Sequence, residues 1–512
     1  MELSLEKKIT KRCERVFCGS TLHEENTEMI VPDQSPDIMR IVKGCADAFL
    51  KDKNVRDGKI DVSGNIKGAV LYIAEGEKNI RKLDVSVPFA YVIDAPGVND
   101  LSKVSARVFL RSLDVREINP RKVSVRANVE LSVCVYAERE LALCRDISGE
   151  DEHGICTKKN TFSVYSPVNI REKSFTISDD IELSPRESGM GTILTASVVL
   201  KPADTKIIGN KAIIKGNACM SYVYEAEDGL PGCGEYELPF SQIIDVEGMD
   251  ESNDLKISLS VSGFELEPQY DAAGKAHYMT ASIAADAVVT VFAEESIELV
   301  DDVYSTKLWL DVQRSEEKCS ILCRKLEKRV AVSESIEAGG SVRNVLDVSV
   351  FLLPPSRRRD EGGEVLCSDA VITVMYVGED DGVYSASRRT SVVCPMPLTT
   401  AHSYEATASV SSKSCAVGAS GEINVRFFTD FDMTETEEIT VPVISMVSAD
   451  AENRRDTGNT PSVIVKRLTH ESDIWSLAKE YCTTVGEIKL ANDIVDDVTL
   501  SPGRMVLIPK KR

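Results

Sequence analysis

The residue types that most often carry chemistry are scattered through this sequence. Its five histidines lie far apart, at His23, His153, His277, His402 and His470. None forms the His-Glu-x-x-His pair by which many zinc hydrolases hold their metal. Gly232-Cys-Gly234 has the composition of a turn, and no phosphate-binding glycine loop precedes a helical pattern. The many carboxylates are distributed as on solvated faces rather than as a catalytic pair. We therefore expect no catalytic residue, no metal site and no cofactor, and interpret the chain as not an enzyme.

Cysteine spacing leads to the same interpretation. Cys13, Cys18 and His23 have the wrong spacing for a zinc knuckle, and no second cysteine pair accompanies them. Cys319 and Cys323 lie four apart on a helix expected over residues 315–328, where a shared apolar face explains them. The 14 cysteines show no short repeated spacing. We expect them to act as small buried apolar residues in a reducing compartment.

Length and charge narrow the class of protein. A chain of 512 residues is too long for one compact core and predicts several domains. The formal net charge of −22 argues against nonspecific binding to nucleic acid or to an anionic membrane. The first residues mix charges where a secretory signal needs an apolar run, and no segment has the length of apolar sequence that spans a bilayer. We expect the protein to stay in the cytosol of the cell that makes it.

Alternation of apolar and polar residues is the main structural signal. Residues 123–135 place seven apolar side chains on one face and mostly polar ones on the other. The pattern returns over residues 279–291 and, in a shorter form, over residues 423–427. A period of two is typical of a β-strand with one buried side, whereas a helix would distribute the same residues around its circumference.

The alternating segments belong to an internal repeat. Residues 59–65 match residues 211–217, and the matched Gly64 and Gly216 are 152 residues apart. A constant offset of this size indicates repetition of whole domains. We expect tandem antiparallel β-sandwich-like domains, with one helix over residues 35–44 that Ser35 would cap. The predicted boundaries are an N-terminal segment at residues 1–30 and β-domains at residues 31–140, 160–312 and 325–448.

The C-terminal part differs in composition. Residues 449–461 are polar and without periodicity, which predicts a flexible linker. Residues 462–510 read as a small β-α-α-β module: a strand from Val463, a helix from Asp473 that Ser472 would cap, a second helix that ends at Asn492, and a closing strand at residues 506–509.

Two parts of the chain resemble known families. The run Val31-Pro-Asp-Gln-Ser-Pro-Asp-Ile-Met-Arg-Ile-Val, with residues 57–64, 87–89 and 119–125, is similar to the SPOCS domain of spore-forming bacteria. Residues 475–478, 484–488, 491–492, 501–503 and 507–509 resemble the LysM fold. Glu471-Ser472 stands where LysM modules that bind N-acetylglucosamine polymers have Gly-Asp, which argues against glycan binding.

The combination of SPOCS-like domains with a terminal LysM module resembles the SipL family of spore-coat morphogenesis proteins. The resemblance implies a scaffold in the mother-cell cytoplasm at the forespore surface, whose LysM module binds SpoIVA, an ATPase of coat assembly. It makes Val463 and Trp475 the candidate partner-binding residues, and core packing remains the alternative role for Trp475. Self-association and other coat proteins are further possible partners of the β-domains. The alternative function is that of a peptidoglycan-binding cell-wall protein.

Overall fold

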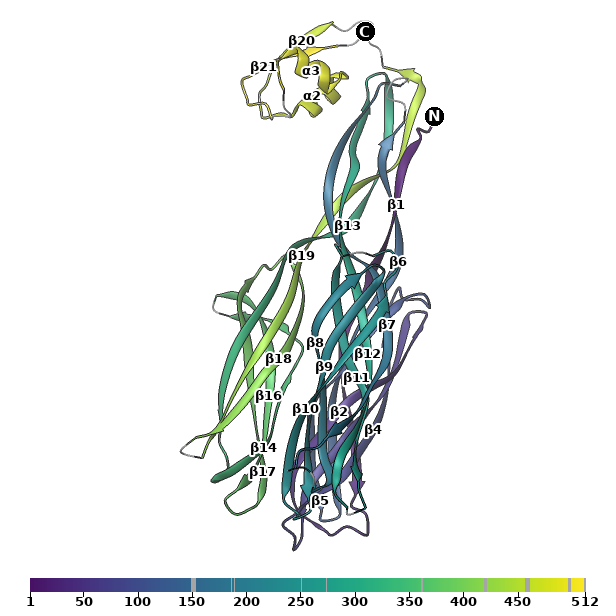
Figure 1. Cartoon of the computed structure of the whole chain (residues 1–512). Helices are drawn as coiled ribbons and strands as arrows, with labels where there is room; N and C mark the ends of the chain where they lie inside the picture. Colours follow the sequence, from purple (N-terminus) through teal and green to yellow (C-terminus); the bar gives the residue numbers. More distant parts are fainter. Residues whose placement is uncertain are drawn as a thin grey trace.

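The protein is described by a computed structural model of residues 1–148, 153–185, 187, 189–249, 251–272, 274–360, 362–418, 421–455, 461–495 and 499–510. Long antiparallel strands dominate it, and two short helices lie near the C-terminal end (Figure 1). Three similar units follow one another, and each is built from two facing sheets. The predicted fold class, tandem β-sandwich-like domains with a final LysM-type module, is confirmed.

The first unit shows the plan of all three. Its strands are β1 (Leu5–Ile30), β2 (Ile38–Arg56), β3 (Lys59–Ala74), β4 (Ile80–Asp94), β5 (Lys103–Asn119) and β6 (Lys122–Ile147). One sheet has the order β1-β6-β5 and the other the order β2-β3-β4. Their inner faces share one apolar core, to which Val70 and Val85 contribute from one sheet and Val123 and Val125 from the other.

The other two units repeat this plan. The second consists of β7 (Ile155–Glu182), β8 (Met190–Ile208), β9 (Lys211–Ala226), β10 (Pro231–Asp245), β11 (Asp254–Tyr270) and β12 (Ala276–Ser305). The third consists of β13 (Leu308–Ile336), β14 (Val342–Leu352), β15 (Ser356–Asp360), β16 (Gly363–Gly378), β17 (Val383–Leu398), β18 (Ser403–Val417) and β19 (Ile423–Arg454). Sheet β11-β12-β7 corresponds to sheet β13-β19-β18, so the first and last strands of each unit always pair.

The alternation in the sequence explains the central strands. Along β6, the seven alternate residues from Val123 to Val135 are at most 1% exposed. Along β12, the same holds from Met279 to Val291. Each strand therefore buries one side chain in two, as a sheet with one face on a core requires.

Two predicted helices are wrong. Residues 38–44 form the start of β2, which pairs along its length with β3, and residues 315–328 lie within β13, which pairs with β19. The Ser-Pro signal at residue 35 is local, whereas strand pairing recruits a whole neighbouring strand. Tertiary pairing therefore overrides the capping signal.

A close approach at the centre of the sheets explains the repeated glycine. A Cβ atom on Gly64 would lie 2.3 Å from the ring of Phe89, and one on Gly216 would lie 2.8 Å from the ring of Phe240. The third unit has Ser368 at the corresponding position, eight residues before Tyr376, and a smaller Val392 opposite it. The glycine and the phenylalanine thus fit each other, and the unit that lacks one also lacks the other.

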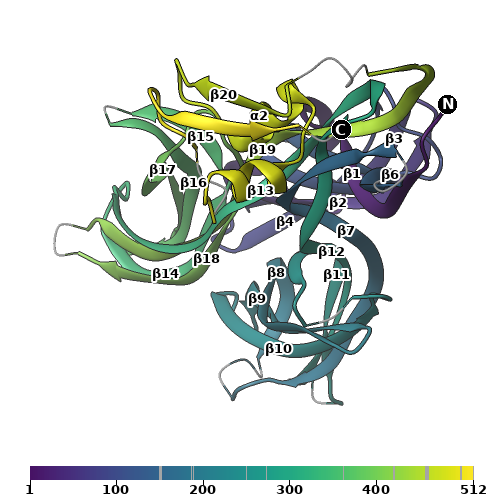
Figure 2. The ribbon, with the colours of Figure 1, turned by 90° about the horizontal axis from the view of Figure 1, so that it is seen from above.

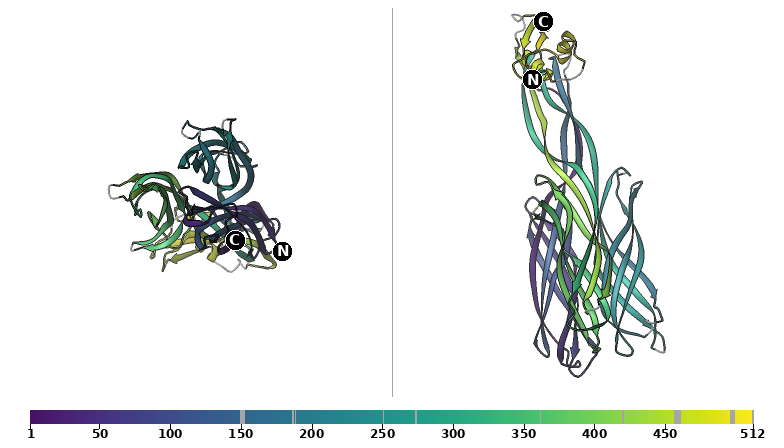
Figure 3. Two further views of the ribbon diagram at one scale, coloured as in Figure 1. Left: turned by 90° about the horizontal axis from the view of Figure 1, so that it is seen from below. Right: turned by 90° about the vertical axis from the view of Figure 1, so that its left-hand side faces the viewer.

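The first and last strands of every unit extend beyond the sandwiches and pack together. They form a narrow bundle of three two-stranded ribbons, which we call the stalk, seen rising above the sandwiches in Figure 1 and in the right-hand view of Figure 3. Its core contains Leu141 from β6, Leu299 and Val303 from β12, and Val441 and Val447 from β19. Seen along the stalk, the three units lie around a common centre (Figure 2).

The ends of the chain differ from the expected boundaries. Residues 1–30, expected to precede the first β-domain, contain β1, which pairs with β6 over its whole length. The first half of the predicted linker at residues 449–461 is strand, because β19 continues to Arg454, and residues 456–460 lie outside the described part of the chain. No helix among the described residues is long and apolar enough to cross a membrane.

Candidate protein-binding site

The C-terminal module has the predicted β-α-α-β order. It consists of β20 (Val463–Arg467), α2 (Ile474–Tyr481), α3 (Val485–Ala491) and β21 (Met505–Pro509). Asp473, rather than Ser472, caps α2, because its carboxylate accepts a hydrogen bond from the backbone of Ser476 at 2.6 Å. Thr484 and Glu487 form a capping box at the start of α3.

The hairpin of β20 and β21 separates apolar side chains between its two faces. Ile464, Val506 and Ile508 point to the helices and belong to the core of the module. The opposite face carries Val463, Val465, Met505 and Leu507, which are 52%, 54%, 63% and 40% exposed. We call these four side chains the hairpin face. An apolar cluster of this kind on a small module is typical of a surface that contacts another protein.

Trp475 lies in a different environment. Its indole nitrogen donates a hydrogen bond of 2.9 Å to Asp302 Oδ2, near the end of β12. Its ring stands edge-on to Tyr304, with centroids 4.9 Å apart. Lys479 Nζ lies 2.8 and 2.7 Å from the two carboxylate oxygens of Asp302. Burial alone would raise the pKa of Asp302, but the hydrogen bonds from Lys479 and Trp475 outweigh it and hold the pKa below its usual value.

Further contacts join the module to the tip of the stalk. The hydroxyl of Tyr304 donates to the carbonyl oxygen of Thr483 at 2.7 Å, and its ring packs within the core of the module. Burial raises the pKa of Tyr304, in keeping with a phenol that stays protonated and donates. Arg455, just after β19, links the two parts: its guanidinium stacks on Trp309 of β13, 3.9 Å from the ring centroid, and its Nη1 donates to Cys482 Sγ of the module at 2.5 Å. The module is therefore docked on the stalk through α2.

The two candidate residues are thus separated by the structure. Val463 is exposed on the hairpin face, whereas Trp475 is partly buried against the stalk. The resemblance to the LysM fold placed both in one partner-binding set. The contacts of Asp302 and Tyr304 with α2 were missed, because these residues precede Trp475 by more than 170 positions and no local spacing marks them.

Comparison with known families assigns both parts of the chain. The SipL SPOCS domain matches residues 37–118 and 189–268, which lie in the first and second units. The LysM domain matches residues 473–509. The chain is SipL-like, with SPOCS domains and a LysM domain. Both families are non-catalytic binding domains, and the SipL match associates the chain with the spore coat. No curated protein and no solved structure gives a significant match.

The three units border an open cleft of about 1810 Å³ that is lined by strands of all three. Lys43 on β2 reaches across it to Asp347 on β14, with 3.4 Å between Nζ and Oδ2. Asp47, four residues after Lys43 on the same face of β2, also lines this cleft. Burial raises the pKa of Asp47 to about 6, although Lys43 opposes the shift. Beside these polar groups the three units share a buried apolar cluster, to which Leu71 of the first unit, Val223 of the second and Met375 of the third contribute.

The cysteines are arranged in part as expected. Cys13 is buried, and His23 stacks on Tyr91 with 3.7 Å between ring centroids, so Cys13, Cys18 and His23 form no common site. Cys18 forms a disulfide with Cys134, directly opposite it on β6, where small apolar thiols were expected. This pair is visible only once the register of β1 and β6 is known.

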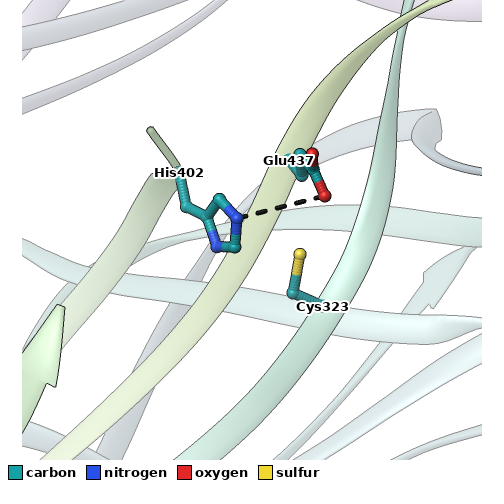
Figure 4. A group of neighbouring side chains, drawn as sticks. All are labelled: Cys323, His402 and Glu437. Atoms are coloured by element: carbon teal, nitrogen blue, oxygen red, sulfur yellow. Dashed lines mark ion pairs between the residues drawn. The ribbon is translucent and has the colours of Figure 1, made fainter. Parts of the chain in front are cut away.

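Within the described part of the chain, one group of metal-ligating residue types comes together in the third unit. Cys323, His402 and Glu437 place one potential ligand atom each within 4.8 Å of the others (Figure 4). The sequence separates them by 79 and 35 positions, so a search for local metal motifs misses them. The expectation of no metal site was based on such local spacing alone.

Proposed function

We propose that the chain is a non-enzymatic scaffold of spore-coat assembly, which binds a SpoIVA-type ATPase through its LysM module and helps tether the coat to the forespore surface from the mother-cell cytoplasm. The proposal is supported by the combination of SipL SPOCS domains with a LysM domain. The observation that carries the partner-binding part is the hairpin face, an exposed apolar surface at the far end of the stalk.

Val463 is the contact residue of this proposal. It is one of four apolar side chains on the hairpin face, and none of the four is needed to fill the core of the module, which Ile464, Val506 and Ile508 fill from the other side of the hairpin. Full burial of an exposed valine contributes ~1.5–3 kcal/mol, and because Val463 is 52% exposed, its burial in an interface would contribute about half of that.

Trp475 acts in the same proposal by holding the module in place. Its indole bonds to Asp302 and packs on Tyr304, so its polar edge and part of its ring are already used within the chain. A partner would reach the indole only after α2 had left the stalk. Trp475 therefore fixes the direction in which the hairpin face is presented.

The decisive experiment compares two charge substitutions in the full chain. Val463→Asp places a carboxylate on the hairpin face, whereas Leu490→Asp places one on α3 at a side chain that is 84% exposed and lies off that face. Binding to a purified SpoIVA-type ATPase should weaken at least ~4–12-fold for Val463→Asp, as expected for the loss of ~0.8–1.5 kcal/mol, and should stay unchanged for Leu490→Asp. Circular dichroism checks that both variants fold.

Two results would overturn the proposal. The first is equal binding of the ATPase by both variants, which would exclude the hairpin face. The second is sedimentation of the unmodified chain with peptidoglycan but no capture of the ATPase, which would favour a cell-wall function. The β-domains are proposed to associate with themselves or with other coat proteins, and analytical ultracentrifugation of the chain without the ATPase tests the first of these.

A further inference from the structure

Three segments of the third unit meet where its ribbon leaves the sandwich. Cys323 comes from β13, Glu437 from β19, and His402 from the turn that leads into β18 (Figure 4). His402 Nε2 lies 3.9 Å from Glu437 Oε2, and the three potential ligand atoms are all within 4.8 Å of one another. The thiol of Cys323 is exposed and the Glu437 side chain is 47% exposed, so both can rotate freely.

The three ligand types suit a zinc-like ion. A thiolate sulfur, an imidazole nitrogen and a carboxylate oxygen bind Zn²⁺ at ~2.3, ~2.0 and ~2.1 Å, and tetrahedral geometry then puts the ligand atoms roughly 3.3–3.6 Å apart. The observed spacing of 3.9 Å between His402 Nε2 and Glu437 Oε2 is larger by an amount that rotation of the exposed Glu437 side chain can supply. A water molecule would complete a four-ligand shell.

A buried carboxylate already orients the histidine. His402 Nδ1 lies 2.7 Å from Glu435 Oε1, and because an ionised carboxylate only accepts, Nδ1 carries the proton and Nε2 keeps its lone pair toward Glu437. Tyr404 donates to the same Glu435 oxygen at 2.7 Å, and Arg324 pairs with the other. A carboxylate behind the histidine is the usual support of a metal-binding imidazole.

The repeat supplies an internal comparison for these positions. All three units have a β-bulge at the same place in the first strand, where one extra residue faces the last strand. The register across this bulge gives the positions that correspond to Cys323, His402 and Glu437. These are Val16, Ser102 and Ala137 in the first unit and Val168, Asn253 and Ala293 in the second. Only the third unit has a thiol, an imidazole and a carboxylate there.

The supporting carboxylate shows the same contrast. Glu435 is 2% exposed, and its counterparts Val135 and Val291 are fully buried valines. A buried carboxylate costs free energy that a valine does not. Since the fold forms twice without this carboxylate, its presence in the third unit points to the histidine that it holds rather than to the fold.

We propose that Cys323, His402 and Glu437 bind one divalent transition-metal ion of the zinc type. The ion joins the turn before β18 to both strands of the β13–β19 ribbon. It therefore fixes the base of the ribbon whose last strand leads to the LysM module. The site is independent of the hairpin face and of the proposed partner.

Cobalt substitution in the full chain tests the site directly. Metal-free protein titrated with Co²⁺ should bind one equivalent and show a thiolate-to-cobalt charge-transfer band with the visible absorption of a four-coordinate ion. Zn²⁺ should displace the cobalt. Cys323→Ser should abolish the charge-transfer band, and Cys415→Ser, at an exposed cysteine outside the group, should leave it unchanged. His402→Gln should weaken Zn²⁺ binding at least tenfold, the lower end of the ~10–100-fold loss that follows removal of even a supporting group.

A second variant keeps the test meaningful if single changes alter folding. Cys323→Val, His402→Asn and Glu437→Ala together give the third unit the residues of the second at these three positions, while Tyr404 and Arg324 remain as partners of Glu435. The triple variant should fold, bind no cobalt, and gain no thermal stability from Zn²⁺, unlike the unmodified chain. The proposal fails if the unmodified chain binds no Zn²⁺ more tightly than the triple variant does, or if Cys415→Ser removes the cobalt band as well.

Discussion

Asp302 is the residue through which the docking of the LysM module is best tested. Its carboxylate accepts from Trp475 Nε1 at 2.9 Å and pairs with Lys479. Asp302→Ala removes both contacts with the module, together with the 2.5 Å ion pair between Asp302 and Arg314 within the stalk, and leaves the core of the module untouched. We expect the variant to keep all its folded parts while the module leaves the stalk for a measurable fraction of the time.

The size of the effect follows from the two contacts. A hydrogen bond to a charged group contributes ~1.5–3 kcal/mol, and a partly exposed ion pair contributes ~0.2–1 kcal/mol. Their loss of about 2–4 kcal/mol shifts the docking equilibrium roughly 30- to 700-fold, because each ~1.4 kcal/mol is a factor of ten. The edge-on packing of Trp475 and Tyr304 stays in the variant and supplies ~0.5–1.5 kcal/mol.

Tryptophan fluorescence reads out this equilibrium. The chain has two tryptophans, Trp309 and Trp475, so Trp309→Phe gives a background in which Trp475 is the only indole. In that background Asp302→Ala should shift the emission to longer wavelength and increase quenching by acrylamide. Asp301→Ala is the matched control, because Asp301 is the next residue on β12 and bonds to Asn160 at 2.9 Å instead of to the module.

A definite outcome would refute the reasoning. If Asp302→Ala and Asp301→Ala give the same emission maximum and the same quenching, the docking contacts contribute nothing measurable in solution. Far-ultraviolet circular dichroism separates undocking from unfolding, because undocking leaves the strands and both helices intact. Loss of the LysM helices together with the spectral shift would instead show that the contacts with Asp302 stabilise the module itself.

Two further predictions concern the β-units. The pKa of Asp47 is about 6 in the fold and ~3.9 in an unfolded chain. The folded state therefore holds the proton of the Asp47 carboxyl more tightly than the unfolded state does. As the pH rises from about 4 to 6, the free energy of unfolding falls by up to ~3 kcal/mol. Asp47→Asn should therefore raise the free energy of unfolding by ~2–3 kcal/mol at pH ~8 and leave it nearly unchanged at pH ~4. Urea denaturation measures both values. Equal gains in stability at the two pH values would contradict this prediction. Gly216→Ala should lower the free energy of unfolding, measured by thermal denaturation, by ~1–3 kcal/mol. The reason is that the added Cβ would lie 2.4 Å from the carbonyl oxygen of Lys201. Gly263→Ala is the control: no atom lies within 4 Å of its added Cβ, so stability should change by less than ~0.5 kcal/mol.

The central strands were predictable from sequence because one face of each strand is buried and the other is polar. Residues 123–135 and 279–291 alternate between a dry core and a polar face, so the period of two appears directly in the residue types. Strand β13 lacks this signal. Most of the side chains along residues 313–335 of β13 are exposed or partly exposed, and a strand without a deeply buried face shows no clear period. That is why residues 315–328 were read as a helix.

Sites assembled across the repeat were out of reach of sequence reasoning. The LysM module could be recognised because its landmarks lie within one short segment. The contacts of Trp475 and the group of Cys323, His402 and Glu437 depend on strand register and on where ribbons end. Once the register is known, the comparison of the three units becomes informative, because each position then has two counterparts in the same chain.

The third unit differs from the other two at the positions where the ribbon leaves the sandwich, and it is also the unit whose last strand runs on toward the LysM module. β19 is continuous from Ile423, in the core of the sandwich, to Arg454 near the tip of the stalk. An ion held by Cys323, His402 and Glu437 would fix this ribbon at its base, and Asp302 fixes the module at its tip. The ion site lies on the β13–β19 ribbon and Asp302 lies on β12 of the second unit, so the two sites share no residue and their variants should behave additively in stability. Coupling between Cys323→Ser and Asp302→Ala would show instead that the ribbon transmits strain between the ion site and the module.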